Sequence, residues 1–132
     1  MTKEEKYAYW LQLAQYDLDT AQAMFAGGRW FYVVFMCQQA LEKLSKGLYN
    51  FYIDDNVPRS HNIRFILEYI ETELSVVIDP GINSLADTLF AHYRDSRYPD
   101  FSRRAAVIGK DEAANLLRKT QEAFAWLLTL KK

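Results

Sequence analysis

The chain has 132 residues, of which 50% are hydrophobic and 15% aromatic, and its formal net charge is −1. This length is enough for one domain with its own core, so we expect a single domain over residues 1–132. The near-neutral charge excludes a protein that coats nucleic acid without sequence preference, because binding along a phosphate backbone needs a cationic field.

No apolar run approaches the roughly 18 residues of a membrane-spanning helix, and the charged N-terminus does not have the pattern of a signal peptide. The single Cys37 excludes an intrachain disulfide and suits a reducing compartment. Its apolar surroundings indicate a buried, unreactive thiol. We therefore expect a cytoplasmic protein without a membrane segment.

Five segments carry the three- and four-residue hydrophobic spacing of helices, and no segment predicts a strand. The first covers about residues 3–26 and should end at Gly27-Gly28, since glycine readily takes the left-handed conformation that follows many helices.

The second covers about residues 30–51. Its first half is apolar on nearly every face, which indicates burial on more than one side and favours contact with another subunit. Its second half is amphipathic, and Glu42 and Lys46 have the order of an i,i+4 pair worth only about 0.3–0.5 kcal/mol.

A polar connector of residues 54–59 follows, and Ser60 is the expected N-cap of a third, shorter helix. Asp79-Pro80 should begin the fourth helix, with Asp79 as N-cap and the proline as first helical residue. The last helix runs from about 111 to 130. Short connectors between long helices favour antiparallel neighbours. The sequence thus predicts an all-α fold, an up-and-down antiparallel four-helix-type bundle with the third helix as a short accessory.

The spacing also predicts which side chains face the core. In the fourth helix they are Ile82, Leu85, Ala86, Leu89 and Tyr93.

Residues 92–100 combine arginines, aromatics and carboxylates where the fourth helix must end, because Pro99 lacks a backbone N–H and disfavours helix before it. Arginine contacts phosphate bidentately and tyrosine stacks on a base, so this segment is a candidate nucleotide or anion site. The candidate residues are Tyr93, Arg94, Arg97, Tyr98 and Asp100. The alternative is an Arg–Asp network that pins one loop onto the bundle.

Three other polar residues are candidates for supporting this site. Asp17 borders the core of the first helix, and a buried carboxylate needs a partner such as Lys43 or an arginine of the 92–100 segment. Such a pair also has a purely structural explanation, since it would hold two helices in register. His61 follows the expected N-cap and either joins the polar site or bonds within the connector.

Motifs for catalysis are weak. The one constellation available uses His92 as a general base for a ribose 2′-hydroxyl, with Arg94 or Arg97 stabilising charge on the phosphate. There is no P-loop and no nucleophile elbow in the sequence. The two histidines lie far apart and outside any Cys/His or Glu-x-x-His spacing, so we expect no metal and no cofactor.

Several short motifs, taken in their order and spacing, resemble the HEPN domain (higher eukaryote and prokaryote nucleotide-binding). They are Tyr9-Trp10-Leu11, Ala14-Gln15-Tyr16-Asp17-Leu18, Gln38-Gln39-Ala40-Leu41-Glu42-Lys43, Ser60-His61-Asn62-Ile63 and Arg97-Tyr98-Pro99-Asp100. The resemblance covers nearly the whole chain. It implies a helical bundle that usually dimerises; many members are encoded beside a minimal nucleotidyltransferase, and the pair often behaves as toxin and antitoxin. Other members are ribonucleases, and some bind nucleotides.

The ribonuclease members carry an arginine, four to six residues, and then a histidine. In this chain Arg59 lies only two residues before His61, and no arginine lies five to seven residues before His92, so those catalytic positions are not carried over. The resemblance therefore implies a homodimeric protein that binds a nucleotide, an RNA end or an acidic partner segment and pairs with a nucleotidyltransferase subunit. The alternatives are a metal-independent ribonuclease toxin using His92 with Arg94 or Arg97, and a dimerisation module without a ligand.

Overall fold

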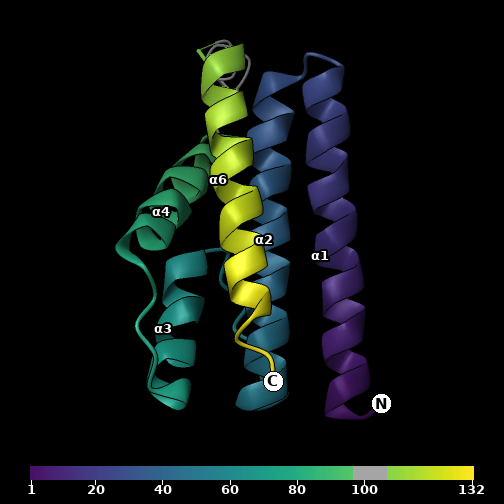
Figure 1. Ribbon diagram of the computed structural model, residues 1–132, viewed down its shortest axis with the longest axis vertical. Coiled ribbons are helices and arrows are strands. Elements are labelled where there is room, and N and C mark those ends of the chain that lie inside the picture. The colour runs from purple at the N-terminus through teal and green to yellow at the C-terminus, as the bar shows by residue number, and fades with distance from the viewer. Residues whose placement is uncertain (97–106) are drawn as a thin grey trace.

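The computed structural model describes residues 1–96 and 107–132 of the chain. The helices of these residues are α1 (Lys3–Ala26), α2 (Trp30–Tyr52), α3 (Ile63–Leu74), α4 (Pro80–Asp95) and α6 (Lys110–Leu128), and the same residues contain no strand. In Figure 1, α1, α2 and α6 run side by side along the long axis, while α4 is inclined and α3 lies below it. The predicted all-α, up-and-down bundle with a short accessory helix is confirmed.

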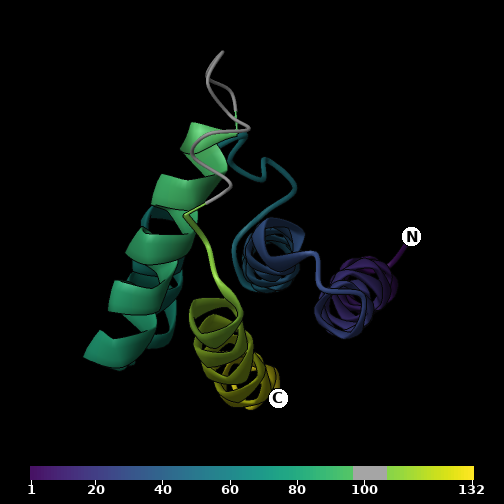
Figure 2. The same ribbon diagram turned by 90° about the horizontal axis from the view of Figure 1, so that it is seen from above.

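Helix α2 is the central element of the fold. It packs against each of the other four described helices, and the view from above shows α1, α6 and the α3–α4 pair arranged around it (Figure 2). The apolar residues that recur at three- and four-residue steps along this helix form a stripe in the core, with its two end residues, Trp30 and Phe51, half-buried. The members of the stripe that are completely buried are Val34, Cys37, Leu41, Leu44 and Leu48. Burial of this apolar surface is the main force that holds the bundle together.

Helices α1 and α2 approach each other closely at Gly47. A Cβ atom added to Gly47 would lie 2.8 Å from the Cβ of Trp10, which is too short for two carbon atoms. The indole N–H of Trp10 donates a hydrogen bond to Oδ1 of Asn50 at 3.3 Å. The missing side chain of Gly47 and this hydrogen bond together fix the register of the two helices.

Two predicted helix boundaries are confirmed. Gly28 follows α1 with a φ of 73°, the left-handed conformation expected there. Asp79 is the N-cap of α4 and accepts a hydrogen bond from the backbone N–H of Gly81 at 2.7 Å, and Pro80 is the first residue of the helix.

The predicted start of the third helix was wrong. The N-cap of α3 is Asn62, whose side chain accepts from the N–H of Phe65 at 3.2 Å. Ser60 accepts instead from the N–H of Asn62 at 3.0 Å, in a turn that precedes the helix. Because this turn occupies Ser60, the helix begins at Ile63.

Among the described helices, none combines the length and the apolar character needed to cross a lipid bilayer.

Candidate functional site

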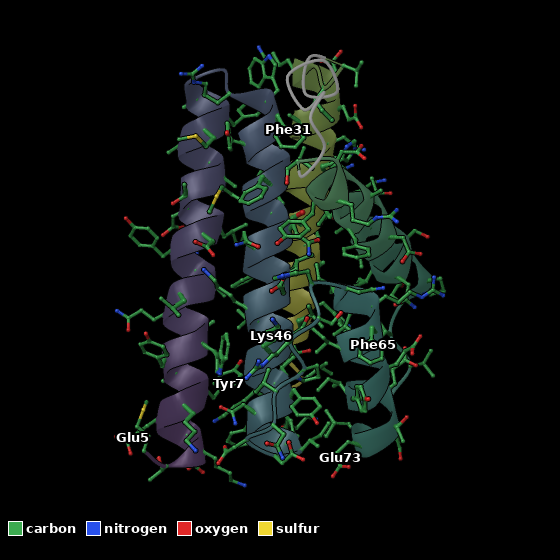
Figure 3. All side chains as sticks on the ribbon, turned by 180° about the vertical axis from the view of Figure 1, so that it is seen from behind. Glu5, Tyr7, Phe31, Lys46, Phe65 and Glu73 are labelled. Atoms are coloured by element: carbon green, nitrogen blue, oxygen red, sulfur yellow. The ribbon has the colours of Figure 1, made fainter. Side chains whose placement is uncertain are left out.

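A cluster of polar side chains lies on α2 where the connector between α2 and α3 returns along the bundle. Its members are Gln38, Glu42 and Lys46 of α2 and His61 of the connector, and we call them the α2 polar cluster. Figure 3 shows this side of the molecule, with Lys46 labelled on α2 and α6 lying behind that helix. The three α2 residues are spaced four apart, so they follow one face of the helix.

Glu42 is the centre of the α2 polar cluster and is only 6% exposed. Its carboxylate accepts a hydrogen bond from Nζ of Lys46 at 3.0 Å and from Nε2 of Gln38 at 3.3 Å. It also lies 3.1 Å from Nδ1 of His61. A buried carboxylate is stable only with such partners, so the three contacts explain how an acidic side chain is accommodated here.

The same network fixes the position of His61. Gln38 donates a second hydrogen bond, at 2.6 Å, to the backbone carbonyl of His61, which holds the connector against α2. The contact between Glu42 and Nδ1 orients the imidazole ring. In the part of the chain that the structure describes, Nε2 of this half-exposed histidine has no hydrogen-bond partner. That nitrogen is free to accept from a ligand or, when protonated, to donate to one.

Tyr93, a predicted site residue, joins the end of α4 to this cluster. Its ring centroid lies 4.9 Å from that of His61, and its ring is also stacked on Phe35 of α2 at 5.6 Å. Tyr93 is 7% exposed. It therefore supports the position of His61 from inside the bundle and presents little ring surface to solvent.

Arg94, the next predicted residue, is exposed at the last turn of α4. Its guanidinium lies over the ring of Phe90, 5.2 Å from the centroid, and it forms no ion pair with a described residue. Arg97, Tyr98 and Asp100 lie outside the described residues. The charge of Arg94 is therefore not neutralised by any carboxylate described in the structure.

The predicted partner of Asp17 proves to be Lys43. Its Nζ lies 2.6 Å from Oδ2 of Asp17, whose side chain is 9% exposed, and the pair connects α1 to α2. Lys43 and Lys46 are three residues apart, so they are neighbours on the helix surface and the ion pair borders the α2 polar cluster.

His92 lies apart from this cluster. Its Nε2 is 3.4 Å from Oε1 of Glu112, a contact that joins α4 to α6. Successive residues of a helix point about 100° apart, so the packing of Tyr93 on α2 turns His92 towards another side. The structure does not bring His61 and His92 together. Nor do the described residues include a group of three or more His, Cys, Asp or Glu side chains placed to hold a metal ion.

Sequence reasoning missed Gln38, Glu42 and Lys46 as members of the site. The local spacing of Glu42 and Lys46 was interpreted as an ordinary surface pair, whereas both side chains are at most 12% exposed. The available signal was the run of three polar residues at four-residue steps along this helix.

The helical fold and this arrangement around the central helix are those of a known class of small α-helical domains. The HEPN domain model matches residues 7–130, so the chain belongs to the HEPN domain family.

Two solved structures are similar to the chain. TT1696 from Thermus thermophilus is 24% identical with a TM-score of 0.81, and the match covers 95% of this chain and 98% of that one. ST0689, described as an archaeal HEPN homologue, is 25% identical with a TM-score of 0.75 over the same shares of the two chains. Among curated proteins, none matches this chain.

Proposed function

We propose that the chain acts as one HEPN domain over residues 1–132, that it binds the phosphate group of a nucleotide or an RNA end, and that it works in the cytoplasm as a homodimer paired with a nucleotidyltransferase subunit. The binding residues of this proposal are Arg94, Arg97, Tyr98 and Asp100. Tyr93, which is buried against His61, supports them together with Asp17, Lys43 and His61. The observation that carries it is the α2 polar cluster, in which an oriented imidazole with an unpaired Nε2 lies against the end of α4.

The chemistry of this region suits a phosphate-bearing ligand. Nε2 of His61 accepts from a ribose hydroxyl in its neutral form and donates to a phosphate oxygen when protonated. Arg94 adds an exposed guanidinium without a described counter-ion. Because charge-assisted hydrogen bonds from arginine to phosphate are stronger than neutral ones, this residue supplies the main attraction for the ligand.

The first half of α2 supports the proposal of a homodimer. Tyr32 is 48% exposed, and Phe35 and Met36 beside it are only half-buried. Exposed aromatic and apolar side chains that adjoin one another are typical of protein interfaces. We therefore place the contact between the two copies along this half of α2.

The pairing with a nucleotidyltransferase, and a toxin–antitoxin relation between the two proteins, rest on membership of the HEPN family. Binding to such a subunit would be an association between whole proteins, so it is compatible with a ligand at the α2 polar cluster.

A ribonuclease is the second candidate, and one observation favours it. A histidine held by a carboxylate at one ring nitrogen and free at the other has the arrangement of a general base. The geometry favours His61 for this task, because it lies 3.1 Å from the buried Glu42, whereas His92 lies 3.4 Å from the exposed Glu112.

The test compares wild type with the double variant Arg94→Ala/Arg97→Ala. Isothermal titration with ATP and with a short single-stranded RNA should show saturable binding to wild type and at least tenfold weaker binding to the variant. The melting temperature should stay unchanged, because Arg94 makes no described ion pair. Arg118→Ala is the matched control, since Arg118 is an exposed arginine of α6 whose hydrogen bonds within the described residues are to Asn115 and Glu122 of the same helix.

An equal loss of affinity in Arg118→Ala would contradict the proposal, and so would the absence of binding to wild type. Unfolding of the double variant would favour the loop-pinning network instead. Incubating the same RNA with wild type, His61→Ala and His92→Ala adds the enzymatic arm. Cleavage that disappears in one histidine variant would identify a ribonuclease and its base.

A further inference from the structure

A groove separates the N-terminal half of α4 from the middle of α6, on a different side of α4 from the α2 polar cluster. Figure 1 shows α4 diverging from α6 towards its N-terminus. The groove has a volume of about 470 Å³. Small-molecule sites in proteins measure about 300–1,000 Å³, so the space is large enough for a ligand. The buried side chains in its lining are Ile82, Leu85, Leu116 and Ala123.

The two ends of this groove differ in chemistry. The two helices run antiparallel (Figure 1). Thr88 of α4 therefore lies at the same end of the groove as Lys119 of α6, and Ile82 lies at the same end as Trp126. Lys119 and Trp126 are seven residues apart, which is about two turns and about 10 Å along one face of α6. Lys119 therefore lies towards one end of the groove, and the aromatic ring of Trp126 lies towards the other, where Asp79 begins α4.

The charges that line the groove are not equally engaged. Glu122 is paired with Arg118 at 3.0 Å, and the carboxylate of Asp79 accepts from the N–H of Gly81 at 2.7 Å. Lys119 is exposed and forms no ion pair or hydrogen bond with any residue in the described ranges. Lys119 is therefore the lining cation without a described counter-ion, above an apolar floor, whereas the carboxylate of Asp79 caps the first turn of its own helix.

We propose that this groove binds an organic monocarboxylate. The carboxylate pairs with Lys119, and an aliphatic or aromatic body about 10 Å long lies over Leu85 and Ala123 and ends against Trp126. A ligand of this kind matches the charge of Lys119 at one end of the groove, the apolar side chains along its floor, and the distance from Lys119 to Trp126.

The dimensions favour a small molecule over a protein segment. The lining residues span about ten positions on each helix, so the groove is about 15 Å long. A stable protein interface buries about 800 Å² on each partner, which requires a longer contact than this.

The test is isothermal titration of the full chain with decanoate and with 2-naphthoate. Each acid should bind saturably with one molecule per chain. Lys119→Ala should weaken binding at least tenfold, and Lys119→Arg should retain it because the charge remains. Lys110→Ala is the matched control, since Lys110 is an exposed lysine at the start of α6 and does not line the groove. Ser84→Trp places a large side chain at an exposed lining position and should block both acids.

Three results would overturn the proposal. The first is the absence of saturable binding by both acids. The second is equal affinity for 2-naphthoate and for the neutral 2-naphthamide, or an equal loss of affinity in Lys119→Ala and Lys110→Ala. Either outcome shows that the charge of Lys119 does not recognise the ligand. The third is binding of an acidic amphipathic peptide by a chain that binds neither acid, which would assign the groove to a protein partner. None of these results bears on the α2 polar cluster, so this inference and the proposed function stand or fall separately.

Discussion

Replacing Gly47 by alanine should destabilise the protein, although alanine is the better helix former. In an unhindered helix interior the exchange gains about 1 kcal/mol. Here the added methyl group would lie 2.8 Å from Cβ and 3.4 Å from Cγ of Trp10. The Cβ atom of Trp10 is attached directly to the α1 backbone, so it cannot rotate away and the helix itself must move.

The magnitude follows from three contributions. Overpacking of this kind costs about 1–3 kcal/mol. Displacing Trp10 also breaks its 3.3 Å hydrogen bond to Asn50, worth about 1 kcal/mol. The loss of the hydrogen bond cancels the gain in helix propensity, so the free energy of unfolding should fall by about 1–3 kcal/mol.

Urea unfolding followed by far-UV circular dichroism measures this change. The midpoint should fall while the slope m stays constant, since the variant exposes the same surface on unfolding. Gly27→Ala is the matched control, because its Cβ would meet only ordinary contacts, the nearest at 3.5 Å, and its φ of −89° suits alanine. We expect that control within about 0.5 kcal/mol of wild type. A Gly47→Ala protein as stable as wild type would refute the close approach of α1 and α2.

Two further predictions concern buried groups. Lys43→Met leaves the carboxylate of Asp17 without its partner and should cost about 2–4 kcal/mol, somewhat less than for a fully buried pair because the Lys43 side chain is 28% exposed. Adding Asp17→Asn should recover most of that loss in urea unfolding, and a double variant no more stable than Lys43→Met would contradict the pairing. Burial raises the pKa of the Cys37 thiol to about 11, so the folded state favours the neutral thiol and this contribution is lost as the pH rises from about 9 to 11. Over that range wild type should lose about 2–3 kcal/mol more than Cys37→Ala, and parallel stability profiles would show that the thiol does not titrate in the core.

Much of the fold was predictable because local signals and burial agree. In α4, the sequence Asp79-Pro80 marks the start of the helix, and every residue predicted to face the core is buried. The start of α3 was not predictable, because Ser60 and Asn62 are both residue types that cap helices. The choice depends on the hydrogen bond from Gln38 to the carbonyl of His61, a contact across 23 positions of sequence. A contact between residues so far apart in the sequence cannot be recognised from the residues around Ser60 and Asn62.

The candidate site was predictable only in part, for similar reasons. The ion pair of Asp17 was predictable because a buried carboxylate needs a polar or charged partner, and in the structure Lys43 is that partner. The burial of Glu42 could not be predicted, because it arises where the connector returns over α2 and places His61 on it. The constellation centred on His92 was built from neighbours in sequence, whereas the fold directs that side chain to Glu112.

The position of the polar cluster on the most enclosed helix has a consequence for recognition. A side chain held between a core helix and three bonded neighbours has already given up its rotational freedom before any ligand arrives. Glu42 is such a side chain, and through it the imidazole of His61 keeps one orientation. Association at this cluster therefore incurs little further loss of side-chain entropy, and selectivity comes from the match between a ligand and a preorganised template.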